Sequence, residues 1–264
     1  MEIMAGINAI ELLREQQLDF IQRIKYSCLL DCQIPGKNSE ITFISEKSKI
    51  KQISKFSYSM CNKYQSKDRE EKYFNYRNNF IGKLGEEAVK NRLTNFITGV
   101  DYTIKNEGDG KVDFTFAFDS SPGGIQVKTR KVDFTFAFDS SPGGIQVKTR
   151  KGTYDTVKWS ITEKEIEANT FLVCMFIEKN VKNKEAENKQ TENKEAEYKN
   201  TSAGFKITSA GFLPMDLIKK EHKIELIKNN GKIEFTIYDL LYISGLNAYL
   251  KKLYDLQVEK LLEI

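Results

Sequence analysis

Two short alternating runs carry the residues whose types and spacing could do chemistry. Asp113 alternates with apolar residues in the run 112–118, and Gln126 and Lys128 do the same in the run 125–129. Strand side chains alternate between the two faces of a sheet, so a hairpin of these runs would gather the three polar side chains on one face. A carboxylate and an amide oxygen suit Mg²⁺ or Mn²⁺, which would activate a water beside the lysine. The pattern therefore indicates metal-dependent phosphodiester chemistry.

The sequence contains this pattern twice. Residues 111–130 (copy one) recur without a change at 131–150 (copy two), which adds Asp133, Gln146 and Lys148. Solenoid repeats diverge and come three or more at a time, so this pair indicates either a recent local duplication or an error in the assembly of the sequence. Expelling one copy as a loop would expose four large apolar side chains, each worth roughly 1.5–3 kcal/mol when buried. We therefore expect both hairpins to lie in one extended sheet.

A glutamine carries no charge, so the metal needs a second carboxylate. Apolar residues at helical spacing predict a helix at 78–97, in which Glu86 borders the apolar face and Glu87 points further away. The glycines of this helix would let it pack closely on the sheet. Both the helix and the turn Gly108-Asp109-Gly110 precede copy one without interruption. We therefore place the complete site at Glu86, Asp113, Gln126 and Lys128.

The succession of these motifs resembles the PD-(D/E)xK nuclease superfamily, and the Gln-x-Lys pair resembles its branch that includes intron-encoded homing endonucleases. The resemblance covers about 75–215 and rests on Gly82, Gly85, Glu86, Val89 and Leu93, on Gly108, Asp109, Gly110, Val112 and Asp113, on Gln126 and Lys128, and on Gly211, Phe212, Leu213 and Pro214. It implies a hydrolase, a Mg²⁺- or Mn²⁺-dependent DNA endonuclease. The implied metal ligands are Glu86, Asp113 and Gln126, with Asp133 and Gln146 in copy two, and Lys128 or Lys148 assists catalysis.

Other segments predict the elements that position these residues. The continuous apolar run 171–177 predicts a fully buried strand, and Thr162 with Glu165 forms a capping box for a helix at 160–169. Further helices are predicted at 9–30 and 246–262, and further strands at 102–104, 132–138, 145–149 and 233–237, while 38–72 is left unassigned. These elements predict an α/β (α+β) fold, with a mixed sheet built on an antiparallel meander and flanked by helices. The family resemblance makes it restriction-endonuclease-like.

The chain divides into three predicted parts. Residues 1–72 form an N-terminal helical and basic extension, 73–245 form the nuclease-like core, and 246–264 form a C-terminal amphipathic helix. Within the core, residues 179–200 are polar and repetitive, so we interpret them as a solvated insertion whose removal would not affect folding.

Composition excludes several classes of function. The only histidine, His222, lies in a polar run, which argues against Ser-His-Asp triads and histidine-metal nucleases. Four scattered cysteines favour a reducing compartment over a zinc site. No signal peptide is visible, and no apolar stretch approaches ~18 residues, so we expect a cytoplasmic protein that does not enter membranes.

The net charge of +4, from 41 basic and 37 acidic residues, means that any DNA surface must be a local patch. Two other functions remain open. One is a DNA-binding module with this fold and no turnover, which the glutamine and the duplication favour. The other is an interaction protein in which residues 1–72 bind a protein partner. A homo-oligomer, the preferred DNA structure and the copy that forms the site also stay open.

Overall fold

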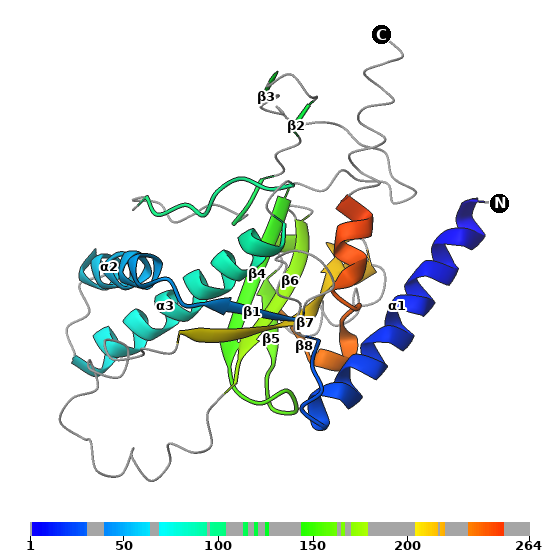
Figure 1. The fold of residues 1–264 in the computed structure, drawn as a ribbon, viewed down its shortest axis with the longest axis horizontal. Helices are drawn as coiled ribbons and strands as arrows, with labels where there is room; N and C mark the ends of the chain where they lie inside the picture. The colour runs from blue at the N-terminus through cyan, green and yellow to red at the C-terminus, as the bar shows by residue number, and fades with distance from the viewer. Residues whose placement is uncertain are drawn as a thin grey trace.

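The chain folds around a mixed four-stranded sheet with helices against it (Figure 1). The sheet has the order β1-β7-β6-β4, and its strands are β1 (Ile41–Ile44), β4 (Gly144–Lys151), β6 (Thr170–Ile177) and β7 (Phe205–Pro214). The structure is a computed structural model and describes residues 2–30, 40–63, 69–93, 96–103, 113–115, 119–120, 125–126, 144–162, 165–166, 170–178, 204–215, 217–219 and 232–250. The predicted mixed α/β class is confirmed.

Strand β6 forms the centre of this sheet. Its apolar run from Phe171 to Phe176 is buried, which confirms the buried strand predicted there. It pairs antiparallel with β7, and β7 pairs antiparallel with β1. Its other neighbour, β4, runs parallel to it, because the connection through 152–169 is long enough for a crossover. Strands β6, β7 and β1 therefore pair antiparallel while β4 pairs parallel, so the sheet is mixed, as predicted.

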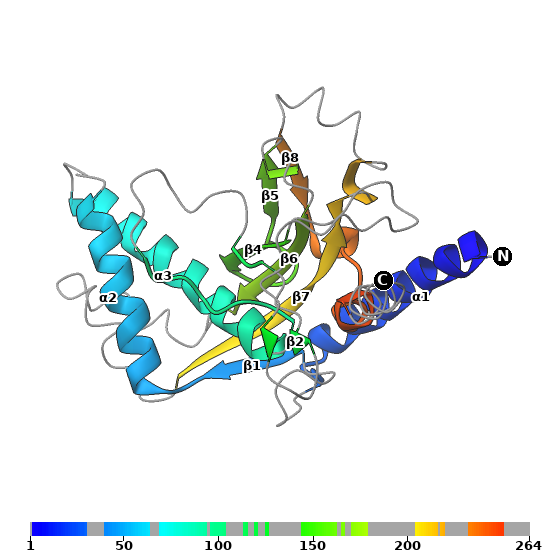
Figure 2. The ribbon, with the colours of Figure 1, turned by 90° about the horizontal axis from the view of Figure 1, so that it is seen from above.

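Three long helices surround the sheet: α1 (Glu2–Lys25), α2 (Lys47–Lys63) and α3 (Arg69–Arg92). α3 packs on the sheet through Leu84, Ala88 and Val89, the apolar face that the sequence predicts. It begins at Arg69 and ends at Arg92, so it is longer at its start and shorter at its end than predicted. Figures 1 and 2 show α2 alongside α3, with α1 at the opposite end of the molecule. A further helix covers 244–250.

The first 72 residues share the core with the rest of the chain. Gln17 of α1 is buried and donates hydrogen bonds to the carbonyls of Ala210 (2.8 Å) and Ile237 (2.9 Å). Glu40 is fully buried before β1, forms an ion pair with Arg23 and accepts the hydroxyl of Tyr242 at 2.7 Å. The hydrogen bonds from Gln17 and Tyr242 span 193 to 220 residues of sequence, so α1 and the residue before β1 are structural parts of the core.

Several predicted elements differ from the observed ones. Trp159–Thr162 is a strand, β5, that pairs antiparallel with β8 (Lys232–Phe235), whereas the sequence predicted a helix from 160. The glutamate half of the predicted capping box is present, because Glu165 accepts hydrogen bonds from the backbone N–H (2.8 Å) and hydroxyl of Thr162. Residues 101–103 are not a strand, and the unassigned segment 38–72 supplies β1 and α2. The strand predicted at 233–237 is confirmed as β8, which ends at Phe235 before the short helix η2 (Ile237–Asp239).

Part of the sequence predictions lies outside the described residues, including strand 132–138, the insertion 179–200 and the tail helix beyond residue 250. Within the ranges that the structure describes, no helix has both the length and the apolar character to span a membrane.

Candidate active site

The candidate site begins at the contact between α3 and β4. A Cβ atom added to Gly85 would lie 1.7 Å from Oγ1 of Thr149, so the helix backbone rests directly on this strand. Any side chain larger than hydrogen at Gly85 would force the two elements apart. Gly82, which the sequence also assigned to close packing, would meet nothing within 4 Å. Of these two glycines, therefore, only Gly85 lies where α3 comes close to β4.

Asp113 is fixed on β4 by both its backbone and its side chain. Its N–H donates to the carbonyl of Ile145 at 3.0 Å, and its carboxylate accepts the N–H of Val147 at 2.6 Å. The next residue, Phe114, is buried and forms an antiparallel bridge with Ile145. The aspartate that opens copy one thus pairs with the end of copy two.

The remaining motif residues divide between two places. Gln146 and Lys148 alternate along β4 with the buried Ile145 and Val147, as expected of one strand face. Gln126 lies in β3 (Ile125–Gln126), which pairs with β2 (Asp119–Ser120) in a ladder separate from the four-stranded sheet. Lys128 and Asp133 lie outside the described residues.

This arrangement corrects the predicted pairing. We expected Asp113 to face Gln126 and Lys128 within copy one, but its strand pairs with Ile145 and its carboxylate with Val147. We also expected one extended sheet, but β2 and β3 form their own ladder. The residues that the structure brings together are Asp113 from copy one and the β4 strand with Gln146 and Lys148 from copy two.

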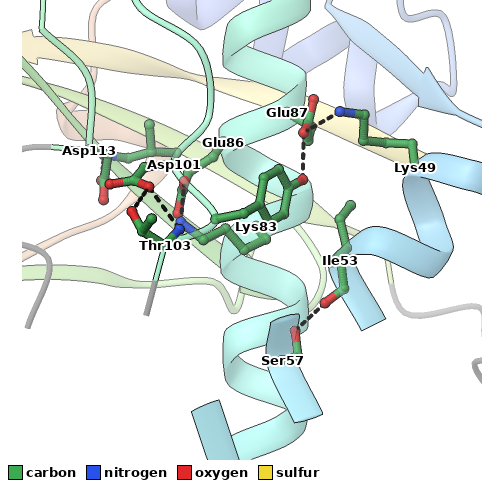
Figure 3. A network of polar contacts seen from close by, with 11 residues as sticks. Lys49, Ile53, Ser57, Lys83, Glu86, Glu87, Asp101, Thr103 and Asp113 are labelled. Carbon is green, nitrogen blue, oxygen red and sulfur yellow. Dashed lines mark hydrogen bonds and ion pairs between the residues drawn. The ribbon is translucent and has the colours of Figure 1, made fainter. Parts of the chain in front are cut away.

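The two glutamates of α3 face different partners. Glu86 is 8% exposed, and its carboxylate lies 2.7 Å from the amine of Lys83, which is itself buried. Figure 3 shows Glu86 on the side of Asp113 and Asp101, whereas Glu87 points to Lys49. Glu86 is therefore the glutamate that could join Asp113 in a ligand set.

Glu87 instead belongs to a contact between α2 and α3. Its carboxylate lies 3.0 Å from the amine of Lys49 and also accepts the hydroxyl of Tyr102. Burial, followed by this hydrogen bond, raises the pKa of Tyr102 above its ordinary value. Tyr102 therefore stays a neutral donor, and Glu87 has two partners on the side away from Asp113.

Sequence reasoning missed Lys83, Asp101 and Tyr102. The amine of Lys83 lies 4.9 Å from the centre of the Phe56 ring, so a cation–π contact supports it as well as Glu86. Asp101 accepts the backbone N–H of Thr103 at 2.8 Å, the local bond of an Asx-turn. The sequence pattern Asp-x-Thr could have predicted that turn, but only the tertiary fold places the turn beside α3.

Lys148 is held by a carboxylate that no sequence motif indicated as its partner. Glu165 forms an ion pair with its amine while also accepting the cap bonds from Thr162. Burial alone would raise the pKa of Glu165, but the hydrogen bonds from Lys148 and Thr162 outweigh it and lower that pKa. Glu165 therefore remains ionised and holds Lys148 in one orientation.

The oxygen atoms at this site suit a hard cation, but few of them belong to carboxylates. Asp113 and Glu86 offer carboxylate oxygens and Gln146 an amide oxygen, which are the ligand types of Mg²⁺ and Mn²⁺. In the part of the chain that the structure describes, no three or more His, Cys, Asp or Glu side chains are grouped so that they could hold a metal ion. A bound metal would therefore rely on the amide and on water in addition to carboxylates.

Comparison with known proteins found no match for this chain. No family model matches the chain, and neither a curated protein nor a solved structure matches it.

Proposed function

We propose that the chain is a metal-dependent DNA endonuclease of the PD-(D/E)xK type with a restriction-endonuclease-like core. One contact supports this most strongly: the Asp113 carboxylate accepts the N–H of Val147, the residue between Gln146 and Lys148. The aspartate of one motif is thereby held on the strand of the other motif, across 34 residues of sequence. Such a juxtaposition is what phosphodiester hydrolysis by these residue types requires.

Each group has a distinct part in the proposed reaction. Asp113, Gln146 and Glu86 would hold Mg²⁺ or Mn²⁺ through oxygen atoms. When bound, the metal would acidify a water and neutralise charge on the phosphate. The ammonium of Lys148 would stabilise the charge that builds up on the phosphate, and Glu165 fixes its position. Since the backbone N–H of Val147 orients Asp113, the carboxylate does not need to reorganise during the reaction.

The proposal is tested with purified protein and supercoiled, linear and branched DNA, in Mg²⁺, in Mn²⁺ and in EDTA. We expect nicking or linearisation that depends on the metal and stops in EDTA. Glu86→Gln should lower the cleavage rate strongly, and Glu87→Gln is the matched control on the same helix turn, because Glu87 pairs with Lys49 instead. Intact DNA under all conditions, from a protein that melts cooperatively, would refute the nuclease.

A second function, DNA binding or protein interaction without cleavage, is favoured by two contacts. The buried amine of Lys83 already neutralises Glu86, and Glu165 already neutralises Lys148. A metal must therefore compete with Lys83 for Glu86. Salt-sensitive DNA binding without cleavage would support the inactive module. A protein that neither cuts nor binds DNA would favour a protein partner for residues 1–72.

A further inference from the structure

Each of the two carboxylates at the candidate site has one oxygen atom already engaged. Oε2 of Glu86 lies 2.7 Å from Nζ of Lys83, and Oδ2 of Asp113 accepts the N–H of Val147 at 2.6 Å. A metal ion at this site therefore finds, on each carboxylate, at most one oxygen that these two partners do not hold. Such a carboxylate serves as a ligand through one oxygen and not through two.

Lys83 is fixed in this position from several sides. Its side chain is buried, as is that of Glu86, which follows about one helical turn later on α3. The amine lies 4.9 Å from the ring centre of Phe56 and 5.9 Å from that of Tyr102, so two aromatic rings support the ammonium. Separating a buried ion pair leaves an uncompensated charge on each partner, so this contact is costly to break.

Mg²⁺ and Ca²⁺ make different demands on carboxylates. Mg²⁺ binds in octahedral geometry, keeps several waters and needs only one or two carboxylates together with substrate phosphates. Ca²⁺ takes about 6–8 oxygen ligands and commonly binds both oxygens of one carboxylate. A Ca²⁺ ion held by both oxygens of Glu86 would lie beside the ammonium of Lys83, where the two positive charges repel each other.

We infer that Lys83 determines which divalent cation the site accepts, because it makes Glu86 a one-oxygen ligand that suits Mg²⁺ or Mn²⁺ and excludes Ca²⁺. The inference rests on the proposed function, in which Glu86 and Asp113 are metal ligands. Lys83 contacts neither metal nor DNA and acts through Glu86, so it is a positioning residue. Among the residues that the structure describes, no group of three or more His, Cys, Asp or Glu side chains could hold a metal ion, so Ca²⁺ gains no third carboxylate there.

The chain offers a matched control at the next residue of α3. Glu87 is buried like Glu86, and its carboxylate lies 3.0 Å from the amine of Lys49. Figure 3 shows this second pair on the side of α3 away from Asp113. Lys83→Met and Lys49→Met therefore each remove one ammonium from a buried glutamate, and only Lys83→Met does so at the candidate site.

The test measures cation binding directly, with the full chain and without DNA. Electron paramagnetic resonance of unbound Mn²⁺ gives the Mn²⁺ affinity, and displacement of bound Mn²⁺ gives the affinities for Mg²⁺ and Ca²⁺. Loss of the ammonium strengthens the binding of both ions through charge, but only Ca²⁺ also gains the second oxygen of Glu86. We expect the ratio of Ca²⁺ affinity to Mg²⁺ affinity to rise roughly 10–100-fold in Lys83→Met, the usual size of effect for a residue that contacts a metal ligand. The ratio should stay at the wild-type value in Lys49→Met.

Several outcomes would overturn this role of Lys83. Equal gains for Ca²⁺ and Mg²⁺ in Lys83→Met would show an effect of charge alone, and the same rise in Lys49→Met would show an effect of breaking any buried pair. A wild type that binds Ca²⁺ more tightly than Mg²⁺ would contradict the inference without any variant. If Lys83→Met does not fold, Lys83→Gln, whose neutral amide does not repel a cation, should show the same rise in the ratio, and an unchanged ratio would overturn the inference.

The plasmid assay separates this inference from the proposed function. Cleavage by the wild type in Mg²⁺, with an unchanged ratio in Lys83→Met, would leave the nuclease standing and remove the role of Lys83. Binding of Ca²⁺ by Lys83→Met alone, with no cleavage by the wild type in any metal, would support Lys83 as the barrier and refute the nuclease. No cation binding by the wild type or by either variant would overturn the inference.

Discussion

The two copies of the repeat have the same sequence and different positions in the fold. Copy one contributes its opening residues, which include Asp113 and the buried Phe114, while copy two contributes its end, from Gly144 onward, as β4. The described remainder of copy one, in β2 and β3, lies in a separate two-stranded ladder. A single strand pairing is thus assembled from the opening of one copy and the end of the other.

The two copies have the same sequence and therefore the same local conformational preferences. Only the residues that flank them can explain why copy one supplies Asp113 and copy two supplies β4. Thr98, before copy one, donates its N–H to the carbonyl of Thr115 at 3.0 Å. Gly152, after copy two, donates its N–H to the carbonyl of Ile177 at 3.0 Å, which extends the pairing of β4 with β6. Only the opening of copy one and the end of copy two have these covalent neighbours. Tertiary contacts of the flanking residues therefore decide which position each of two equal sequences takes.

The largest difference between the copies should appear at the aspartates. Asp113→Ala removes the carboxylate held by Val147, so we expect cleavage to fall about 10³-fold or more, equivalent to roughly 4 kcal/mol of transition-state stabilisation. Asp133→Ala, the same substitution in an equal sequence, should leave activity within a few-fold of the wild type. Initial rates on supercoiled DNA at saturating Mg²⁺ measure both. A dead Asp133→Ala with an active Asp113→Ala would reverse the assignment of the copies.

The lysines should show the next largest difference. Lys148→Ala removes the β4 amine that forms an ion pair with Glu165. We expect cleavage to fall roughly 10²–10³-fold while DNA affinity changes only modestly. Lys128→Ala is the matched control in copy one. Cleavage rates and anisotropy with the same duplex separate chemistry from binding. A parallel loss of affinity and cleavage would make Lys148 a phosphate contact.

Much of this fold could be predicted because apolar patterns mark it directly. The apolar run from Phe171 predicts β6. The apolar residues of α3 recur at helical spacing, so they predict its buried face despite the charged residues between them. By contrast, α2 was not predicted, since lysines interrupt the pattern of its four buried apolar residues, Ile53, Phe56, Met60 and Cys61. The cap at Thr162 was predicted, but the residues before it form a strand, because a cap marks only where a helix begins.

The candidate site was less accessible to prediction. The motif residues Asp113, Gln146 and Lys148 follow from alternation and spacing. Which copy supplies each of them does not, because pairing depends on contacts of Thr98 and Gly152 that lie outside the repeat. Glu165 reaches Lys148 only through a tertiary contact, so no local pattern marks it as a partner, whereas Lys83 pairs with Glu86 three residues later on the same helix, a spacing that the sequence does contain.

A stability difference should accompany the difference in activity. Ile145 of β4 is fully buried in the hydrophobic core, so Ile145→Ala should lower the free energy of unfolding by about 2–5 kcal/mol. Ile125→Ala makes the same change in β3, outside the four-stranded sheet, and we expect less than about 1 kcal/mol. Urea unfolding followed by circular dichroism measures both. Equal destabilisation would show that the two isoleucines are packed alike.

The smallest expected effect comes from removing one copy. Deleting 111–130 or 131–150 yields the same chain, in which Asp113 is followed by a single Gln-x-Lys strand. The pairing between Phe114 and Ile145 now closes a separation of 31 residues, which falls to 11 after the deletion. Closing a shorter loop loses less entropy, so the free energy of unfolding should rise by about 0.9 kcal/mol. For a chain of this size that is a rise of roughly 2 °C in Tm.

Cleavage by the single-copy protein should be retained, because the aspartate, glutamine and lysine keep both of their natural flanks. Differential scanning calorimetry and the plasmid assay on the single-copy protein test the two parts separately. A drop of several degrees would mean that the residues between the paired halves contribute packing. Loss of cleavage at unchanged Tm would mean that the active hairpin needs residues of both copies.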